Sequence, residues 1–191
     1  MKDQINNYFN RYINLSEQEL NDFCSCLKIK TFQKNEYLLQ EGQVCKNKYF
    51  ISEGLVRSSY IDKKGNEKIL EFGIENWWVT NIDSFSKEGS SQYDIQAIEP
   101  TTVLMLSKVN LEKLYHSIPQ LERAFRVITE NMLIAFQRRN YFFMKKNSKE
   151  RYNSLIKGIP GFAQRVPQYM IASYLEITPE YLSTIRKNEN S

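Results

Sequence analysis

Polar residues near the C-terminus follow the pattern of two short helices that could recognise the major groove of DNA. Residues 168–175 predict a first helix, and Ala172 is small at a point where two helices must cross closely. Thr178 suits the N-cap of a second helix, and Pro179 suits its first turn. This spacing predicts a helix-turn-helix, whose second helix enters the major groove. The alternative is a helix pair with no role on DNA.

The turn between the two predicted helices departs from the usual motif at one position. Ile177 is expected to fill the corner, and Leu182 and Ile185 are expected to face the first helix. Glu176 stands where such turns usually carry glycine. If that position requires a positive φ, the glutamate adopts a backbone conformation that costs free energy.

Residue types that build metal centres and catalytic triads are scarce. His116 is the single histidine, which argues against most zinc sites and against a Ser-His-Asp triad. Cys24, Cys26 and Cys45 are too few for a usual iron–sulfur cluster, and their odd number argues against a disulfide framework. We therefore expect no enzyme, no metal and no cofactor. A thiol redox sensor at Cys24 and Cys26 and a haem ligated by His116 are the alternatives.

The composition is that of a folded protein with an uneven distribution of charge. The chain has 191 residues, a net charge of +4 and 41% hydrophobic residues. Residues 1–118 carry a net charge of −2, residues 119–146 carry +4 and residues 147–191 carry +2. A basic C-terminal part suits a nucleic-acid partner. The chain has no apolar run long enough to span a membrane and no visible secretory signal, so we expect no membrane partner and a cytoplasmic location.

The N-terminal half predicts helix followed by short strands. Residues 4–27 have helical spacing of apolar residues, and Ser16 with Glu19 resembles a capping box. Residues 62–66 predict a hairpin turn. The predicted strands are 28–32, 37–39, 49–52, 55–61, 68–72, 93–97 and 102–106. Short strands at this spacing suggest a β-barrel or sandwich.

A long helix is expected to follow the strands. Residues 108–117 predict a short helix, and Pro119 can open a longer one that ends near residues 145–148. Its apolar stripe consists of Leu121, Phe125, Ile128, Met132, Ala135 and Phe136. This spacing predicts the seam of a homodimer, and the alternative is a helix packed on its own barrel. Ser148 is expected to cap the next helix, which Gly158 and Pro160 end.

Two motifs resemble those of the Crp/Fnr family of bacterial transcription regulators. The first reads YLLQEG at residues 37–42 and YFISEGLVR at residues 49–57. The second reads RVP at residues 165–167, IASYL at 171–175 and ITPE at 177–180. The resemblance implies an α+β fold in three parts. Residues 1–118 form a cyclic-nucleotide-binding-like sensor domain (a double-stranded β-helix or jelly roll), 119–146 a dimerisation helix, and 147–191 a winged-helix-like helix-turn-helix domain.

The resemblance also implies which residues contact DNA. Glu180 falls where the family commonly reads a base, and a carboxylate can accept a hydrogen bond from cytosine N4. Thr184 falls where many members carry a guanine-reading arginine, so it leaves the base preference open. The candidates for phosphate contacts, which position a protein without specifying sequence, are Ser173, Thr178, Arg186 and Lys187, with Arg165 as a further candidate. The full set of expected DNA contacts is Ser173, Thr178, Pro179, Glu180, Tyr181, Ser183, Thr184, Arg186 and Lys187.

The stretch that resembles the family's phosphate-binding cassette lacks an arginine. No arginine lies between Arg57 and Arg123, so a cyclic phosphate would have no bidentate partner. The expected pocket is instead mainly aromatic, and it consists of Phe72, Gly73, Trp77, Trp78, Phe85, Gln92 and Tyr93. Such a pocket would suit an unidentified small-molecule effector other than cyclic AMP. The alternative is ordinary core packing.

These observations predict a dimeric transcription regulator of the Crp/Fnr type that binds a palindromic operator in double-stranded DNA. An effector, or the ligand-free state itself, would set the spacing of two recognition helices, about 34 Å apart. RNA polymerase is a further expected partner. The rival interpretation is a small-molecule binding module, for a ligand such as a cyclic nucleotide, with vestigial DNA binding.

Overall fold

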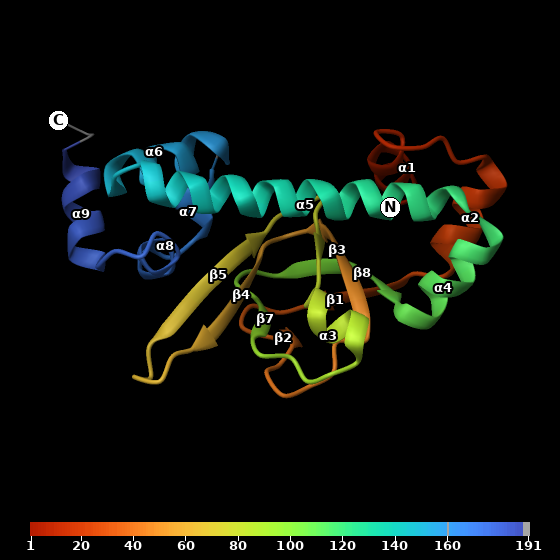
Figure 1. Cartoon of the computed structure of the whole chain (residues 1–191), viewed down its shortest axis with the longest axis horizontal. Coiled ribbons are helices and arrows are strands. Elements are labelled where there is room, and N and C mark those ends of the chain that lie inside the picture. Colours follow the sequence, from red (N-terminus) through yellow and green to blue (C-terminus); the bar gives the residue numbers. More distant parts are fainter. Residues whose placement is uncertain (160, 189–191) are drawn as a thin grey trace.

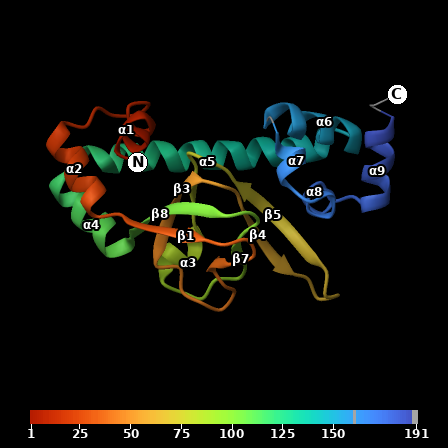
Figure 2. The ribbon, with the colours of Figure 1, turned by 180° about the vertical axis from the view of Figure 1, so that it is seen from behind.

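The computed structural model describes residues 1–159 and 161–188. Two antiparallel four-stranded sheets form a β-roll, and a long helix, α5, runs along one side of it (Figure 1). Helices from the N-terminal part gather at one end of α5 and the C-terminal helices at the other (Figures 1 and 2). No helix of the described residues is long and apolar enough to cross a membrane.

The β-roll is built from eight strands in two sheets. One sheet has the order β1-β8-β3-β6 and the other β2-β7-β4-β5. The strands are β1 (Lys28–Phe32), β2 (Tyr37–Leu39), β3 (Asn47–Glu53), β4 (Val56–Ile61), β5 (Glu67–Gly73), β6 (Trp78–Val79), β7 (Asp94–Ala97) and β8 (Thr101–Ser107). The predicted hairpin between β4 and β5 is confirmed: the backbone N–H of Asp62 donates to Asn66, and Gly65 adopts a φ of 81°. Each of the seven predicted strands is found, with ends shifted by up to two residues.

Three short elements were not predicted from the sequence: β6, the helix α3 (Ile82–Lys87) and the helix α7 (Phe162–Arg165). Asn81 caps α3, because its side chain accepts a hydrogen bond from the backbone N–H of Ser84 at 3.1 Å. Elements of two, four and six residues are too short for hydrophobic periodicity to reveal them.

The predicted helix over residues 4–27 is wrong, because two helices occupy this region. α1 (Lys2–Phe9) ends at Asn10, and α2 (Glu17–Ser25) begins after Ser16. The predicted capping box is confirmed: the Ser16 hydroxyl accepts from the backbone N–H of Glu19, and the Glu19 carboxylate accepts from Ser16 at 2.8 Å. Because an N-cap has non-helical backbone angles, this capping box separates the two helices.

The first half of α5 packs against its own chain. α4 (Lys108–Ser117) has the predicted bounds, and α5 spans Gln120–Lys145 with Pro119 at its N-cap. Leu121, Phe125 and Ile128 are buried in the main core of the same chain. Their assignment to a dimer seam is therefore corrected: they anchor α5 in the main core, where the ring of Phe125 contacts rings from α1, β6 and α4.

The second half of α5 is exposed. Met132 and Phe136 are 42% and 55% exposed, and Ala135 between them is also exposed. Other apolar side chains on this segment are exposed too, namely Leu133, Ile134, Tyr141 and Met144. An exposed apolar segment of this kind indicates a surface that contacts a partner.

A second core joins the C-terminal helices to the β-roll. These helices are α6 (Ser148–Gly158), α7 (Phe162–Arg165), α8 (Gln168–Tyr174) and α9 (Pro179–Lys187). From the β-roll, Leu55, Ile69, Phe72 and Ile98 belong to this core. The expected cap of α6 is corrected, because Asn147 rather than Ser148 accepts from the backbone N–H of Glu150 at 3.0 Å. The expected role of Pro160 in ending this helix lies outside the described residues.

Candidate nucleic-acid interface

The helix-turn-helix is formed by α8 and α9. The Thr178 hydroxyl accepts from the backbone N–H of Tyr181 at 3.2 Å, and Pro179 is the first helical residue, both as predicted. In the turn, the backbone N–H of Ile177 donates to Ala172 at 3.0 Å. Glu176 adopts a φ of 58°, so the position does require the left-handed backbone that glycine favours. Glu176 therefore adopts a backbone conformation that is less favourable for glutamate than for glycine.

One face of α9 is buried and the other is exposed. Leu182 and Ile185 are buried in the core beneath. The exposed residues of α9 and its cap are Thr178, Pro179, Glu180, Tyr181, Ser183, Thr184 and Lys187, whereas Arg186 is half-buried. The Thr184 hydroxyl donates to the carbonyl of Glu180 at 3.2 Å. α9 therefore presents hydroxyl, carboxylate and cationic groups on a single exposed face, as direct readout of bases requires.

Ser173 is directed toward the β-roll. Its hydroxyl donates to the carbonyl of Glu67 at 3.0 Å and accepts from the backbone N–H of Ile69 at 3.1 Å. Both partners belong to β5, so the hydroxyl is already occupied. A phosphate contact from Ser173 would require α8 to leave β5.

Arg165 also contacts the β-roll, through a double ion pair. Its guanidinium donates to the Glu75 carboxylate at 2.6 Å and to the Glu99 carboxylate. Glu75 also accepts from the backbone N–H of Gly54 at 3.1 Å. Burial alone would raise the pKa of Glu75, but the hydrogen bonds from Arg165 and Gly54 lower it below its ordinary value. The expected phosphate contact of Arg165 is therefore corrected, because its guanidinium joins α7 to the β-roll here.

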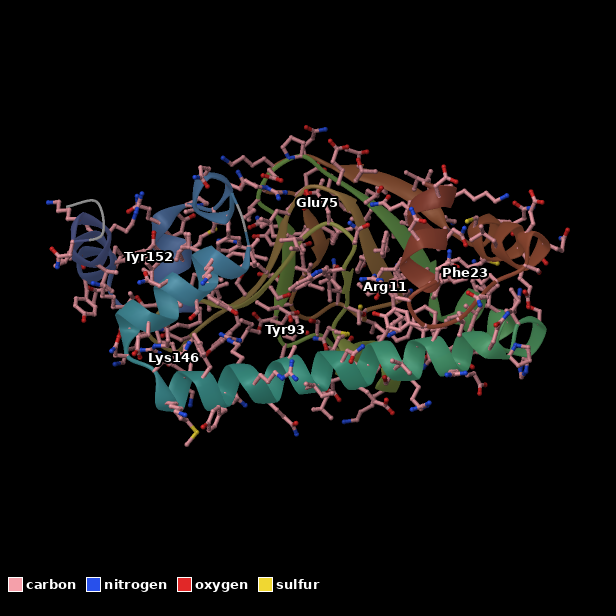
Figure 3. All side chains as sticks on the ribbon, turned by 90° about the horizontal axis from the view of Figure 1, so that it is seen from above. Arg11, Phe23, Glu75, Tyr93, Lys146 and Tyr152 are labelled. Carbon is pink, nitrogen blue, oxygen red and sulfur yellow. The ribbon has the colours of Figure 1, made fainter. Side chains whose placement is uncertain are left out.

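The C-terminal helices are held on two sides. Glu75 lies on the side of the β-roll away from α5 (Figure 3). On the side of α5, the guanidinium of Arg139 lies 4.3 Å from the ring centroid of Tyr174 and donates to the carbonyl of Leu70. Arg139 thus connects α5, β5 and α8, a role that its place in the sequence does not indicate.

We expect Arg165→Met to weaken the docking of α8 on β5. The variant leaves Glu75 and Glu99 without their cation, so amide hydrogen exchange at Ile69 should become at least about fivefold faster. Lowering the pH should also weaken the docking of α8 on β5. The pKa of Glu75 is lowered in the fold, so its stabilising contribution is complete above the ordinary value of about 4.3 and is lost as the pH falls below it.

Arg151→Met, on α6 and outside this ion pair, is the control for general effects of removing an arginine. Unchanged exchange at Ile69 in Arg165→Met would show that the ion pair does not hold the helices.

The structure does not bring the expected effector residues into one pocket. Phe72 packs on Phe162, with ring centroids 5.0 Å apart, and so belongs to the second core. Trp78 is buried in the main core, whereas Trp77 is 48% exposed. The other members are also dispersed. Gly73 leaves no room for a Cβ beside Val79, Phe85 is buried and Gln92 is exposed. Tyr93 lies beside α5, with its hydroxyl 3.5 Å from the Thr80 carbonyl (Figure 3). Core packing therefore explains most of this aromatic set.

The thiol groups and the histidine are not gathered in a metal centre. All three cysteines are free, and Cys45 is buried. Burial raises the pKa of Cys24, which disfavours a reactive thiolate. His116 is exposed on α4. Among residues 1–159 and 161–188, no group of three or more potential ligands could hold a metal ion.

Known proteins resemble this chain along most of its length. Residues 29–117 match the family model of the cyclic nucleotide-binding domain. Electron transport regulator A of Shewanella oneidensis is 25% identical over 167 residues, which cover 82% of this chain and 66% of that protein. The fumarate and nitrate reduction regulatory protein of Escherichia coli K12 is 25% identical over 185 residues, which cover 90% of this chain and 72% of that protein. This chain thus spans about two thirds of the first relative's length.

Solved structures share the fold at lower sequence identity. FixK2 from Bradyrhizobium japonicum has a TM-score of 0.73 at 20% identity, covering 85% of this chain and 83% of its own. The catabolite activator protein of Thermus thermophilus has a TM-score of 0.60 at 16% identity, covering 95% of this chain and 85% of its own. These likenesses extend over both the β-roll and the C-terminal helices.

Proposed function

We propose that this chain is a transcription regulator of the Crp/Fnr family and binds a palindromic operator as a homodimer. The observation that carries the proposal is α9: its cap, first turn and exposed polar face suit insertion into the major groove. The division into a sensor part (1–118), a connecting helix (119–146) and a DNA-binding part (147–191) belongs to the same proposal. We also propose that the protein has no catalytic activity and that RNA polymerase is a further partner.

The exposed half of α5 is the proposed dimer contact. Met132, Ala135 and Phe136 remain from the predicted seam, and Leu133 and Ile134 extend the apolar surface around the helix. A second copy that packs along this segment would remove these side chains from water. It would also place two recognition helices on one duplex, as a palindrome requires.

Cyclic AMP is not the proposed effector. Arg57 is the one arginine within residues 29–117, and its guanidinium lies 2.7 Å from both Glu67 and Gln96. It is buried and already paired, so it is not available to a cyclic phosphate.

Selection of the purified protein against a random duplex library, at about 0.15 M salt, tests the proposal. We expect enrichment of a two-fold palindrome without added ligand. The rival function, a small-molecule binding module with vestigial DNA binding, predicts no enrichment with or without a ligand. Absence of enrichment in buffer, with cell extract and with cyclic AMP would contradict the proposed function.

Glu180→Gln should relax specificity at one base pair of each half-site. Glutamate accepts from cytosine N4, so its loss should reduce discrimination at that position by about 1–3 kcal/mol. The affinity for non-operator DNA should change much less, because phosphate contacts dominate it. Glu176→Gln, in the turn before α9, is the matched control. If the two variants select the same base preferences as the wild type, Glu180 does not read a base.

A further inference from the structure

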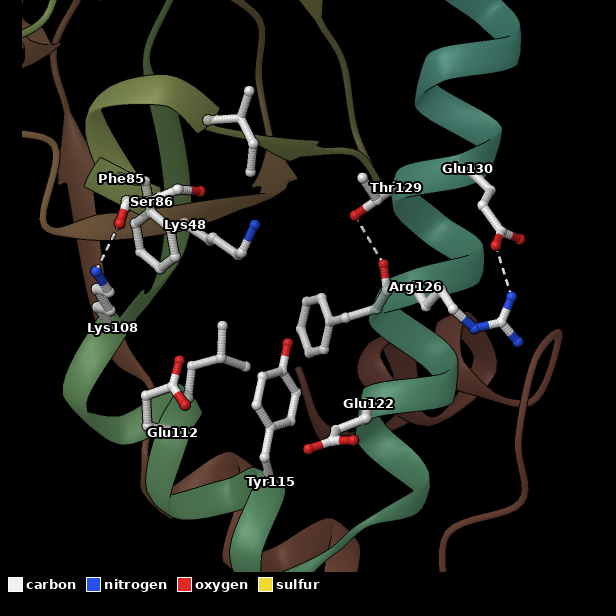
Figure 4. A pocket seen from close by; sticks show the side chains of 13 residues that line it. Lys48, Phe85, Ser86, Lys108, Glu112, Tyr115, Glu122, Arg126, Thr129 and Glu130 are labelled. Atoms are coloured by element: carbon white, nitrogen blue, oxygen red, sulfur yellow. Dashed lines mark hydrogen bonds and ion pairs between the residues drawn. The ribbon is translucent and has the colours of Figure 1, made fainter. Parts of the chain in front are cut away.

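An open groove of about 530 Å³ lies between α3, α4 and the first half of α5 (Figure 4). Its apolar walls include Phe85 from α3, Leu111 and Tyr115 from α4, and Phe125 from α5. Of the seven residues expected to form an effector pocket, only Phe85 lines it. The groove is therefore separate from the predicted effector site.

Lys48, on β3, is a buried cation at the inner end of this groove. Lys48 is 9% exposed, and its ammonium group points into the space between α3 and α5 (Figure 4). The ammonium lies 4.8 Å from the ring centroid of Phe85 and 6.0 Å from that of Phe125. Within residues 1–159 and 161–188, no carboxylate and no hydrogen-bond acceptor pairs with this ammonium, whose nitrogen remains accessible from the open groove.

A largely buried cation without a protein partner carries a desolvation cost that a ligand anion would offset. Burial lowers the pKa of Lys48, because the charged form loses hydration. The two ring faces compensate only part of that loss. A methionine would fill the same space without the charge, so packing alone does not explain a lysine here.

The other charged groups of the groove limit which anion fits. Lys108 pairs with Glu88 at 3.1 Å, and Arg126 pairs with Glu130 at 2.6 Å, so these cations are already neutralised. The remaining carboxylates, at Glu112 and Glu122, line the groove without such an ion pair among the described residues. They repel a multiply charged anion such as phosphate more strongly than a singly charged one, so an anion with one negative charge suits the groove best.

We propose that this groove binds a small monocarboxylate with an apolar body. The carboxylate pairs with the Lys48 ammonium, and the body lies against Phe85, Leu111, Tyr115 and Phe125. The bound ligand would contact both the β-roll and α5, the helix that leads to the C-terminal helices. The inference does not depend on DNA binding, and it is tested without DNA.

Isothermal titration of the full chain with hexanoate tests the site, and 1-hexanol serves as the uncharged comparison. Hexanoate should bind the wild type at least about tenfold more tightly than 1-hexanol, since the hydrogen bond from Lys48 is charge-assisted. Lys48→Met should lower the affinity for hexanoate by at least about tenfold and leave the affinity for 1-hexanol unchanged. Lys46→Met, an exposed lysine two residues earlier, should leave both affinities unchanged.

Thermal unfolding without ligand provides a second readout. Lys48→Met should raise the Tm, because it removes an uncompensated buried charge, whereas a purely structural lysine predicts a lower Tm. Three results would overturn the proposal: no hexanoate binding at 10 mM by the wild type, equal binding of hexanoate and 1-hexanol, or hexanoate binding that Lys48→Met does not weaken. A groove covered by a second copy of the chain would produce the first of these.

Discussion

Phe125→Ala should lower the free energy of unfolding by about 3–5 kcal/mol, the range measured when a buried phenylalanine becomes alanine. Phe125 is 5% exposed, and its ring contacts those of Phe9, Trp78 and Tyr115 at centroid distances of 5.9, 5.5 and 6.1 Å. Alanine would leave a cavity where α1, α4 and β6 meet α5. Denaturant titration followed by circular dichroism measures the change.

Phe136→Ala is the matched control for this prediction, because it removes the same side chain from an exposed position eleven residues further along α5. Its effect on the unfolding of the isolated subunit should stay below about 1 kcal/mol. The comparison must be made at a protein concentration at which the chain is monomeric, since a dimer contact would add its own stability. If Phe125→Ala destabilised the chain no more than Phe136→Ala, Phe125 would not be part of the subunit core.

Phe136→Glu should convert the proposed dimer into a monomer and weaken operator binding at least about 100-fold. Pairing of two copies along α5 would bury Phe136, and a carboxylate at the centre of an apolar contact loses its hydration without gaining a partner. A monomer can engage only one half-site at a time, so it loses the gain in effective concentration that a dimer has on a palindrome. Analytical ultracentrifugation and operator titration measure the two effects.

Gln137→Glu introduces the same charge at the next position, about 100° further around the helix. It should leave the oligomeric state and operator affinity close to those of the wild type. A Phe136→Glu protein that remained dimeric would place the dimer contact elsewhere. A monomeric variant with unchanged operator affinity would contradict the requirement for a dimer.

Local signals in the sequence were sufficient to predict many elements. The capping box of Ser16, the cap at Thr178 and the proline at position 179 act through groups within a few residues, so their patterns are readable without a fold. The hairpin turn over residues 62–66 belongs to the same class. For the same reason the positive φ of Glu176 could be anticipated from the motif alone.

Contacts between distant segments could not be predicted in this way. An apolar stripe shows which face of α5 avoids water, but not what covers it. Leu121, Phe125 and Ile128 were therefore assigned to a partner, although the main core of the same chain buries them. Arg165 meets carboxylates 66 and 90 residues away, and Ser173 meets a backbone group 104 residues away. Lys48 is an unremarkable lysine in the sequence, and only the packing of α3 and α5 around it isolates its charge. Side-chain type and spacing determined the local elements, whereas tertiary structure alone decided which surfaces remain available to a partner or ligand.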